Sequence, residues 1–143
     1  MFRHQTVRAF AIVALAGLGC GRGAEPAAPA AAQTFTDIVL APGQTATPTG
    51  TNLQVRFDRV ESDSRCPIDV TCVWAGEAAM DLQLTVGDST AAVELRSSGA
   101  PGARVMFEGY EISVQRLDPA PHSQRPIDPR AYRLKLAVQS VTR

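Results

Sequence analysis

The sequence has no excess of charge of either sign, since its 143 residues include 14 Lys and Arg and 14 Asp and Glu side chains. A strongly basic face is the usual footprint of proteins that bind nucleic acid or anionic membrane surfaces. The balanced composition therefore argues against nucleic acid as a partner and against a polybasic membrane patch. At this length the chain has room for one folded domain.

Residues with catalytic or metal-binding chemistry are also few. His122 is the one histidine after residue 4, and no serine lies in a G-x-S-x-G motif, so a hydrolase triad has little support. The spacing of Cys66 and Cys72 is not that of a zinc finger, and no EF-hand pattern is present. A copper site formed by these cysteines with Met80 and His122 is the weaker alternative. We therefore predict no catalytic residue, no metal and no cofactor.

The chain lacks an apolar run long enough to cross a bilayer as a helix, but it begins with a shorter one. Residues 9–18 are apolar and follow Arg3 and Arg8, as in an export signal. The next segment, Gly17-Leu18-Gly19-Cys20, resembles a bacterial lipobox, whose cysteine is lipidated and becomes N-terminal after cleavage. We predict a lipoprotein signal peptide at 1–19 and lipidation of Cys20. The alternative is ordinary signal-peptidase cleavage near residue 30.

Residues 21–34 are rich in alanine and proline and have too little apolar bulk to form a core. Together with the lipidated Cys20 they read as a tether, 20–34, which would reach roughly 40 Å when fully extended. The folded domain is then expected at 35–143. These features predict an exported protein of the cell envelope, held on the outer membrane or the periplasmic face by its lipid anchor, with the membrane as one partner.

The stretch 63–77 holds the other two cysteines and the single tryptophan. Pro67 restricts both its own backbone and that of Cys66, which favours a tight loop. With Cys20 lipidated, Cys66 and Cys72 remain as a pair in an oxidising compartment, and we predict a disulfide between them. On an extended strand Trp74 would share a face with Cys72, so the indole is expected to be a core anchor.

Charged residues surround the two cysteines. Asp63 is expected to cap the turn, and Arg65 to pair with Asp63 or Glu77. The alternatives are a hard-cation site formed by the acidic residues and a recognition role for an exposed Arg65. The candidate recognition loop consists of Asp63, Arg65, Pro67, Asp69, Trp74 and Glu77.

The run D-S-R-C-P-x-x-V-x-C-V-W-A-G-E at 63–77 resembles a motif of an uncharacterised family of small bacterial secreted proteins and lipoproteins. The resemblance extends to Pro42-Gly43-Gln44 upstream and to Gly109-Tyr110 and Tyr132 downstream. It implies an exported protein and carries no established activity.

From residue 35 onward, alternating apolar residues and turn signals predict strands and no helix. The clearest strand is 77–86, and 52–61 alternates in the same way until Val60 breaks the phase, which indicates a bulge. About seven or eight short strands predict an all-β fold, an antiparallel β-sandwich. Residues 128–132 loosely resemble an immunoglobulin tyrosine corner, which favours an immunoglobulin-like arrangement, and a closed β-barrel is the alternative.

The sequence thus predicts a non-catalytic envelope lipoprotein, a binding or structural module with an unidentified protein or small-molecule partner. An inhibitor-like protein that presents the Cys66–Cys72 loop is the first alternative, because a pinned loop is pre-organised for a groove. An enzyme or a metal-binding protein is a weaker one.

Overall fold

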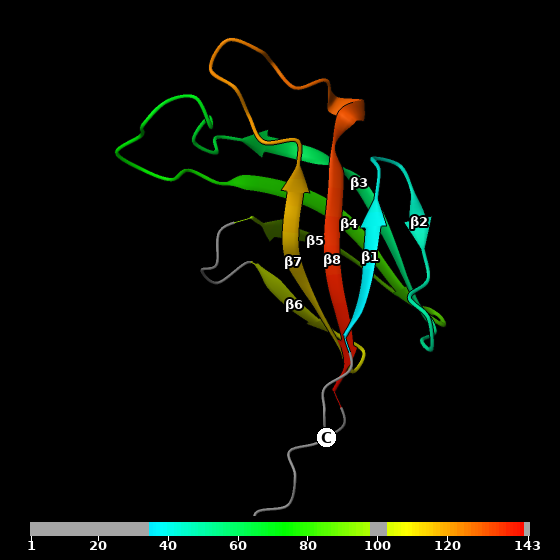
Figure 1. Cartoon of the computed structure of the whole chain (residues 1–143). Coiled ribbons are helices and arrows are strands. Elements are labelled where there is room, and N and C mark those ends of the chain that lie inside the picture. The colour runs from blue at the N-terminus through cyan, green and yellow to red at the C-terminus, as the bar shows by residue number, and fades with distance from the viewer. Residues whose placement is uncertain (1–34, 98–102, 142–143) are drawn as a thin grey trace, which may run out of the picture. The chain divides into compact units, whose positions relative to one another are not determined.

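The computed structural model describes residues 35–97 and 103–141, and they form two four-stranded antiparallel sheets (Figure 1). The strand orders are β1-β8-β7-β6 and β2-β3-β4-β5. The predicted signal peptide, the lipidated Cys20 and the tether lie outside the described residues. The strands are β1 (Thr36–Leu40), β2 (Thr45–Ala46), β3 (Leu53–Asp63), β4 (Ala78–Val86), β5 (Ser89–Arg96), β6 (Arg104–Phe107), β7 (Tyr110–Asp118) and β8 (Arg133–Ser140), and a 3-10 turn covers Pro129–Ala131.

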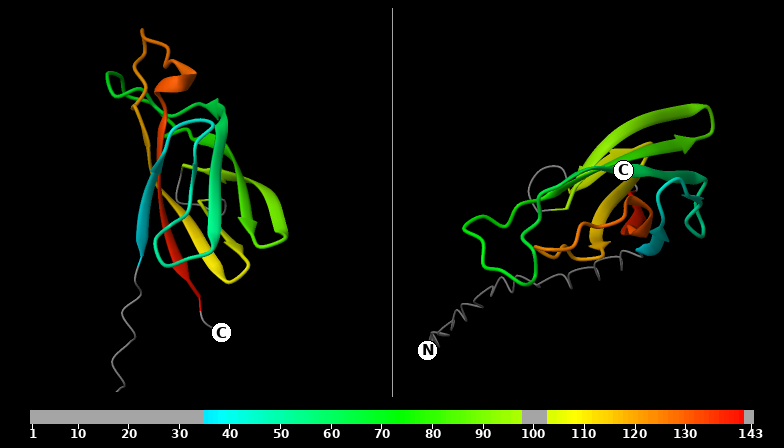
Figure 2. Two further views of the ribbon diagram at one scale, coloured as in Figure 1. Left: turned by 90° about the vertical axis from the view of Figure 1, so that its right-hand side faces the viewer. Right: turned by 90° about the horizontal axis from the view of Figure 1, so that it is seen from above.

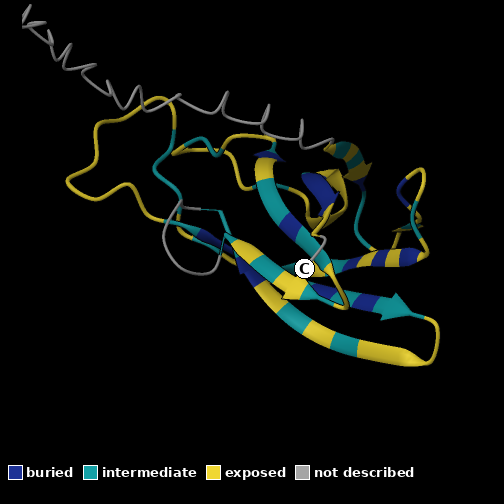
Figure 3. Cartoon of the chain, turned by 90° about the horizontal axis from the view of Figure 1, so that it is seen from below, coloured by how far each residue is buried: buried dark blue, intermediate teal, exposed yellow. Residues whose placement is uncertain are grey.

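The predicted antiparallel sandwich is confirmed, and the period-two pattern explains it. Leu53, Val55 and Phe57 of β3 are fully buried, while the residues between them face outward. Figure 3 shows the same alternation of buried and exposed residues along the other strands. Each sheet buries one face against the other, so the core lies between them.

The predicted bulge in β3 is also confirmed. The pairing of β3 with β4 shifts between Phe57 and Arg59 and again between Val60 and Ser62. Beyond these shifts β3 continues to Asp63, two residues farther than the sequence predicts. The extension places Asp63 opposite Ala78, at the end of the sheet where the connection between β3 and β4 begins.

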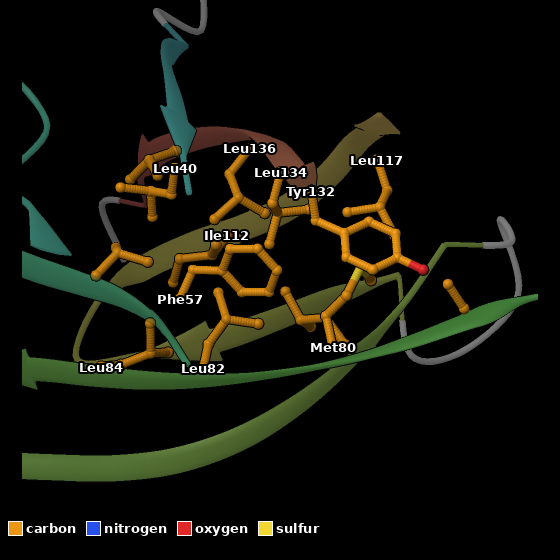
Figure 4. Packing of buried hydrophobic residues seen from close by; sticks show 14 of the residues in the cluster. Leu40, Phe57, Met80, Leu82, Leu84, Ile112, Leu117, Tyr132, Leu134 and Leu136 are labelled. Atoms are coloured by element: carbon orange, nitrogen blue, oxygen red, sulfur yellow. The ribbon is translucent and has the colours of Figure 1, made fainter. Parts of the chain in front are cut away.

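The core runs the length of the sandwich and ends beneath that loop. Figure 4 shows side chains from both sheets packed together, with Met80, Leu117 and Tyr132 toward one end. Tyr132 is 7% exposed, and its ring belongs to the apolar cluster. The largest fully buried side chains are Phe57, Leu40, Leu53, Met80, Leu82, Leu84, Leu95, Ile112, Leu134, Leu136, Val55 and Val138.

The domain has two distinct ends. Thr36 pairs with Val138 and Leu40 with Leu134, so β1 starts at the end where β8 finishes. The long β3–β4 and β7–β8 connections lie together at the opposite end, at the top of Figure 1. A hydrogen bond between Tyr132, just before β8, and Asp63 joins them there. The chain therefore enters the domain far from its longest loops.

Candidate functional site

The connection between β3 and β4, residues 64–77, is called the cysteine loop here. The predicted Cys66–Cys72 disulfide is present, with the two Cα atoms 5.9 Å apart. Below it the two arms of the loop continue the antiparallel pairing of the sheet. The Ser64 N–H donates to the Glu77 carbonyl over 2.8 Å, and the Cys66 N–H donates to the Ala75 carbonyl over 2.8 Å. The loop is therefore closed at its base by hydrogen bonds and higher up by a covalent bond.

Gly76 allows the two arms to approach each other. Its φ is +63°, and a Cβ at this position would lie 1.8 Å from the Ser64 carbonyl oxygen. Both facts favour glycine, because other residues rarely adopt this φ and the contact is with backbone that cannot move aside. The bend that the sequence predicts at Gly76 is thus the place where the backbone of this arm lies against the Ser64 carbonyl of the other arm.

Arg65 and Asp63 form a nearly buried ion pair at the base of the loop, where the side chains are 16% and 10% exposed. The guanidinium donates to both carboxylate oxygens, from Nε over 2.8 Å and from Nη2 over 2.7 Å. The Asp63 carboxylate also accepts the Arg65 N–H, which is the predicted turn cap. This two-pronged geometry fixes the orientation of both side chains.

The same guanidinium binds the connection between β7 and β8, residues 119–132, which we call the proline loop. Arg65 donates to the carbonyl oxygen of Leu117 and to that of Pro119, the latter over 2.9 Å. Arg65 thus pairs with Asp63, as the sequence predicts, and links the two sheets. The alternative, an exposed Arg65 with a recognition role, does not agree with a side chain that is 16% exposed. Its guanidinium donates hydrogen bonds to the Asp63 carboxylate and to two backbone carbonyls.

Tyr132 completes the cluster by donating its hydroxyl to the Asp63 carboxylate over 3.0 Å. This bond differs from that of an immunoglobulin tyrosine corner, where the hydroxyl reaches backbone a few residues upstream. Burial and the bond to Asp63 raise the pKa of Tyr132 to about 12. Burial acts to raise the pKa of Asp63 as well, but the hydrogen bonds and the charge of Arg65, with the Tyr132 hydroxyl, hold it below 3.8.

A second set of contacts joins the two loops nearer their tips. The Asp69 carboxylate accepts the Ser123 N–H over 2.9 Å and the Ser123 hydroxyl over 2.7 Å, and these bonds lower the pKa of Asp69. His122 Nδ1 lies 3.9 Å from the same carboxylate. The Ile68 N–H donates to the Pro121 carbonyl over 3.0 Å. Because the Ser123 hydroxyl donates to the carboxylate and not to the imidazole, Ser123, His122 and Asp69 do not form the serine–histidine pair of a hydrolase triad.

Trp74 does not anchor the core: it is 83% exposed, and the prediction of a buried indole is wrong. The prediction assumed that the strand runs through Cys72 and Trp74, whereas β4 begins only at Ala78. Because the segment before it is a loop pinned by a disulfide, the alternation of a strand does not apply. Of the two partners expected for Arg65, the structure has Asp63. Glu77, the other expected partner, forms an ion pair with Arg96.

Trp74 is one of four exposed apolar residues in the cysteine loop. Val73 is 91% exposed, Ile68 65% and Val70 47%. Of the candidate recognition residues, only Trp74 belongs to this group, whereas Asp63, Arg65, Asp69 and Glu77 bind within the protein. We call these four residues, Ile68, Val70, Val73 and Trp74, the apolar tip.

The sequence contained a signal for the apolar tip that the prediction did not use. Ile68 and Val70 lie between the two cysteines, and Val73 and Trp74 follow Cys72 directly. So short a segment has no second layer against which to bury four bulky apolar side chains. The partners of Arg65 and Asp69 in the proline loop had no such signal. They lie more than fifty positions away in the sequence.

A shallow groove of about 420 Å³ runs beside the base of the cysteine loop, lined by Arg65, Cys66, Ala75, Gly76, Ser97, Gln115, Arg116 and Leu117. Within 35–97 and 103–141 no group of three or more His, Cys, Asp or Glu side chains is arranged to hold a metal ion. Cys66 and Cys72 are joined to each other, so they offer no thiolate. Nor do the described residues include a helix of the length and apolar character that would span a membrane.

Comparisons with protein-family models, with curated proteins and with solved structures found no match to this chain. The candidate site is a rigid two-loop end of a β-sandwich that presents the apolar tip.

Proposed function

We propose that this protein is a non-catalytic lipoprotein of the cell envelope whose apolar tip binds another envelope component. Export and anchoring rest on the sequence of residues 1–34, with Cys20 as the lipidated residue. The Cys66–Cys72 disulfide supports export, since such bonds persist in oxidising compartments and are rare in the cytosol.

The observation that carries the binding role is the exposure of Trp74 and Val73 on a loop that is otherwise fixed. Exposed apolar residues scattered over a surface are ordinary, whereas several gathered on one projecting loop mark interaction sites. Tryptophan is also prominent among the residues that dominate binding energy at protein interfaces. Because Val73 and Trp74 bury little surface in the folded domain, they are available to bury it against a partner.

The rigidity of the loop favours binding further. The disulfide, the Arg65 cluster and the Asp69–Ser123 contacts hold the cysteine loop before any partner arrives. Ordering a flexible loop on binding costs free energy, and a loop that is already ordered avoids most of that cost. A small apolar contact can then give measurable affinity.

Binding is tested by immobilising the exported protein and passing envelope extract over it. A retained component should be lost with Trp74→Ala and weakened with Val73→Ala. The matched control is Met106→Ala, which truncates an apolar side chain of 54% exposure on β6, outside the tip. Equal retention by all variants would show that the tip is not the binding surface.

Anchoring is tested separately by cell fractionation. With Cys20→Ser the protein should move from the membrane fraction to the soluble fraction. If the variant remains with membranes to the same extent as the unchanged protein, lipidation at Cys20 is not the anchor.

An inhibitor-like function is the second candidate, and the projection of the disulfide-pinned loop favours it. A loop held in one conformation by Pro67 and the disulfide fits the groove of a protease with little loss of entropy. A panel of proteases, assayed with and without the purified protein, separates this role from simple binding. Stoichiometric inhibition that disappears with Trp74→Ala would establish it.

A further inference from the structure

The edge strand β5 offers a second interaction surface, which contains none of the four residues of the apolar tip. It is the outermost strand of its sheet, and among the described strands it pairs only with β4. At eight residues it is also the longest of the four edge strands, since β1 has five, β6 four and β2 two. Short edges protect a sheet from pairing with other chains, and β5 lacks this protection.

The hydrogen-bonding direction of β5 follows from the pairing across the sheet. The Phe57 N–H donates to Gln44 on the β2 side of β3, so Arg56, its neighbour, bonds toward β4. Arg56 pairs with Gln83, and Gln83 in turn pairs with Ala92. Because Gln83 uses its backbone groups on β3, its opposite residue Ala92 directs its own N–H and C=O away from β4.

Thr90 and Glu94, two positions before and after Ala92, also direct their backbone N–H and C=O groups away from β4. Their side chains and that of Ala92 are exposed. The register of β5 on β4 is regular from Ser89 to Arg96, without a bulge, and the strand contains no proline. Figure 2 shows the β4–β5 hairpin extending away from the other sheet, and Figure 3 shows exposed residues along its outer strand. An incoming strand therefore finds an unbroken row of backbone donors and acceptors.

The charges along β5 of one copy are complementary to those along β5 of a second copy that runs antiparallel to it. If a second copy pairs antiparallel with a two-fold axis through Ala92, Thr90 faces Glu94 of the second copy. Asp88, in the hairpin turn directly before β5, comes opposite Arg96. Both ends of the pair then join an aspartate to an arginine, and cross-strand pairs of opposite charge are favourable. Arg96 binds Glu77 and Glu94 within its own chain, yet its side chain is 44% exposed.

Other registers are less favourable. An axis through Glu94 places two glutamates opposite each other, and an axis through Ala91 places Asp88 opposite Glu94. Like charges directly opposite are destabilising. Axes through Thr90 or Val93 give no ion pair. An axis through Leu95 also places Glu94 opposite Arg96, but only residues 94–96 of β5 then overlap, whereas residues 89–95 overlap about Ala92. The register through Ala92 is therefore the one that combines opposite charges with a long overlap of the two strands.

We propose that β5 pairs with β5 of a second copy about a two-fold axis through Ala92, which joins two four-stranded sheets into one continuous sheet. About six backbone hydrogen bonds form across the axis, since each hydrogen-bonded pair exchanges two. The contact is smaller than a standard interface, so the dimer forms reversibly at high protein concentration.

The experiment is sedimentation equilibrium of the exported protein, with Cys20→Ser so that no lipid is attached. The mass should double as the concentration rises to about 100 µM, the range of weak protein complexes. Ala92→Pro removes an N–H that β4 does not use and should leave a monomer. A monomer for the unchanged protein at that concentration would overturn the proposal, and so would a dimer that Ala92→Pro does not affect.

Charge exchange tests the register itself, independently of any folding defect in the proline variant. Asp88→Arg alone faces Arg96 of its copy, and Arg96→Asp alone faces Asp88, so each variant should be monomeric. A mixture of the two restores both ion pairs, and a heterodimer should appear. Gln115→Arg on β7 is the control for added charge and should dimerise normally. If the mixture stays monomeric while this control dimerises, the register through Ala92 is wrong.

Discussion

The base and the apolar tip of the cysteine loop differ sharply although they lie within one short segment. At the base, Asp63 and Arg65 are almost buried and each bonds to groups from the other sheet. At the tip, Val73 and Trp74 are among the most exposed apolar residues described. The difference shows that the polar residues at the base of this loop bind within the protein, whereas its large apolar side chains are exposed. Within this loop, contacts between polar groups therefore hold the structure, while the apolar core between the sheets holds the rest of the domain.

The largest expected effect at the base comes from Gly76→Ala. The added Cβ would collide with the Ser64 carbonyl and would also require a positive φ. We expect a loss of about 4 kcal/mol or more in the free energy of unfolding, measured by urea denaturation. Gly87→Ala is the matched control, because its φ is +56° and nothing lies within 4 Å of the new Cβ. That variant should lose only ~1–2 kcal/mol. Similar losses in both variants would mean that the arms are not in close contact.

Asp63→Asn should cost about 3 kcal/mol, because it leaves the Arg65 guanidinium without its carboxylate in a nearly buried site. Asp118→Asn is the control: it breaks an exposed pair with Arg116, and its cost should stay below ~1 kcal/mol. Both are measured by urea denaturation. Equal costs would show that the base is no more important than a surface ion pair.

The pH dependence of stability identifies the same cluster. The pKa of Asp63 is lowered in the folded protein. Its contribution to the free energy of unfolding is therefore present above pH 3.8 and is lost as the pH falls below that value. The pKa of Tyr132 is raised from 10.0 to about 12, so its contribution is present below pH 10 and is lost as the pH rises toward 12. Asp63→Asn should flatten the acid side of a melting-temperature profile, and Tyr132→Phe the alkaline side.

Removing the disulfide with Cys66→Ser and Cys72→Ser should have an intermediate effect. The ring is small, so the lost constraint on the unfolded chain amounts to about 2 kcal/mol. The domain should still fold, with a lower melting temperature, because the Arg65 cluster and the base hydrogen bonds remain. A variant that fails to fold would mean that the disulfide and not the base holds the loop.

The smallest effect on stability is expected at the tip. Trp74→Ala removes a side chain that is 83% exposed, so the free energy of unfolding should change by no more than ~0.5 kcal/mol. The same substitution should abolish binding in the retention experiment. A loss of several kcal/mol would show that the indole packs against the protein after all.

Local patterns in the sequence were sufficient for the strands, the β3 bulge and the disulfide. The alternation of Leu53, Val55 and Phe57 reflects burial on one face, and this rule needs no knowledge of the partner strand. Asp63 as a turn cap for Arg65 was equally local. These predictions succeeded because the interacting residues are close in sequence or follow one period.

The remainder of the site depends on contacts across the sandwich. Nothing near Asp63 indicates that Tyr132, 69 positions later, donates to it, or that Arg65 reaches the Leu117 carbonyl. Trp74 was misplaced because a strand was assumed where Gly76 and the disulfide form a loop. Pairing between distant loops is set by the assembly of the two sheets, and a local pattern does not contain it.

The separation of the two ends of the domain sets how far the apolar tip stands from the proposed anchor. Strands of eight or nine residues span roughly 30 Å at about 3.3 Å per residue. The tether would add roughly 40 Å when extended. A partner in the same membrane that comes within this radius meets the tip at an effective concentration of about millimolar. With the proposed anchor and partner, a contact of four apolar side chains that is too weak to persist between freely diffusing molecules would then be sufficient to keep the two together.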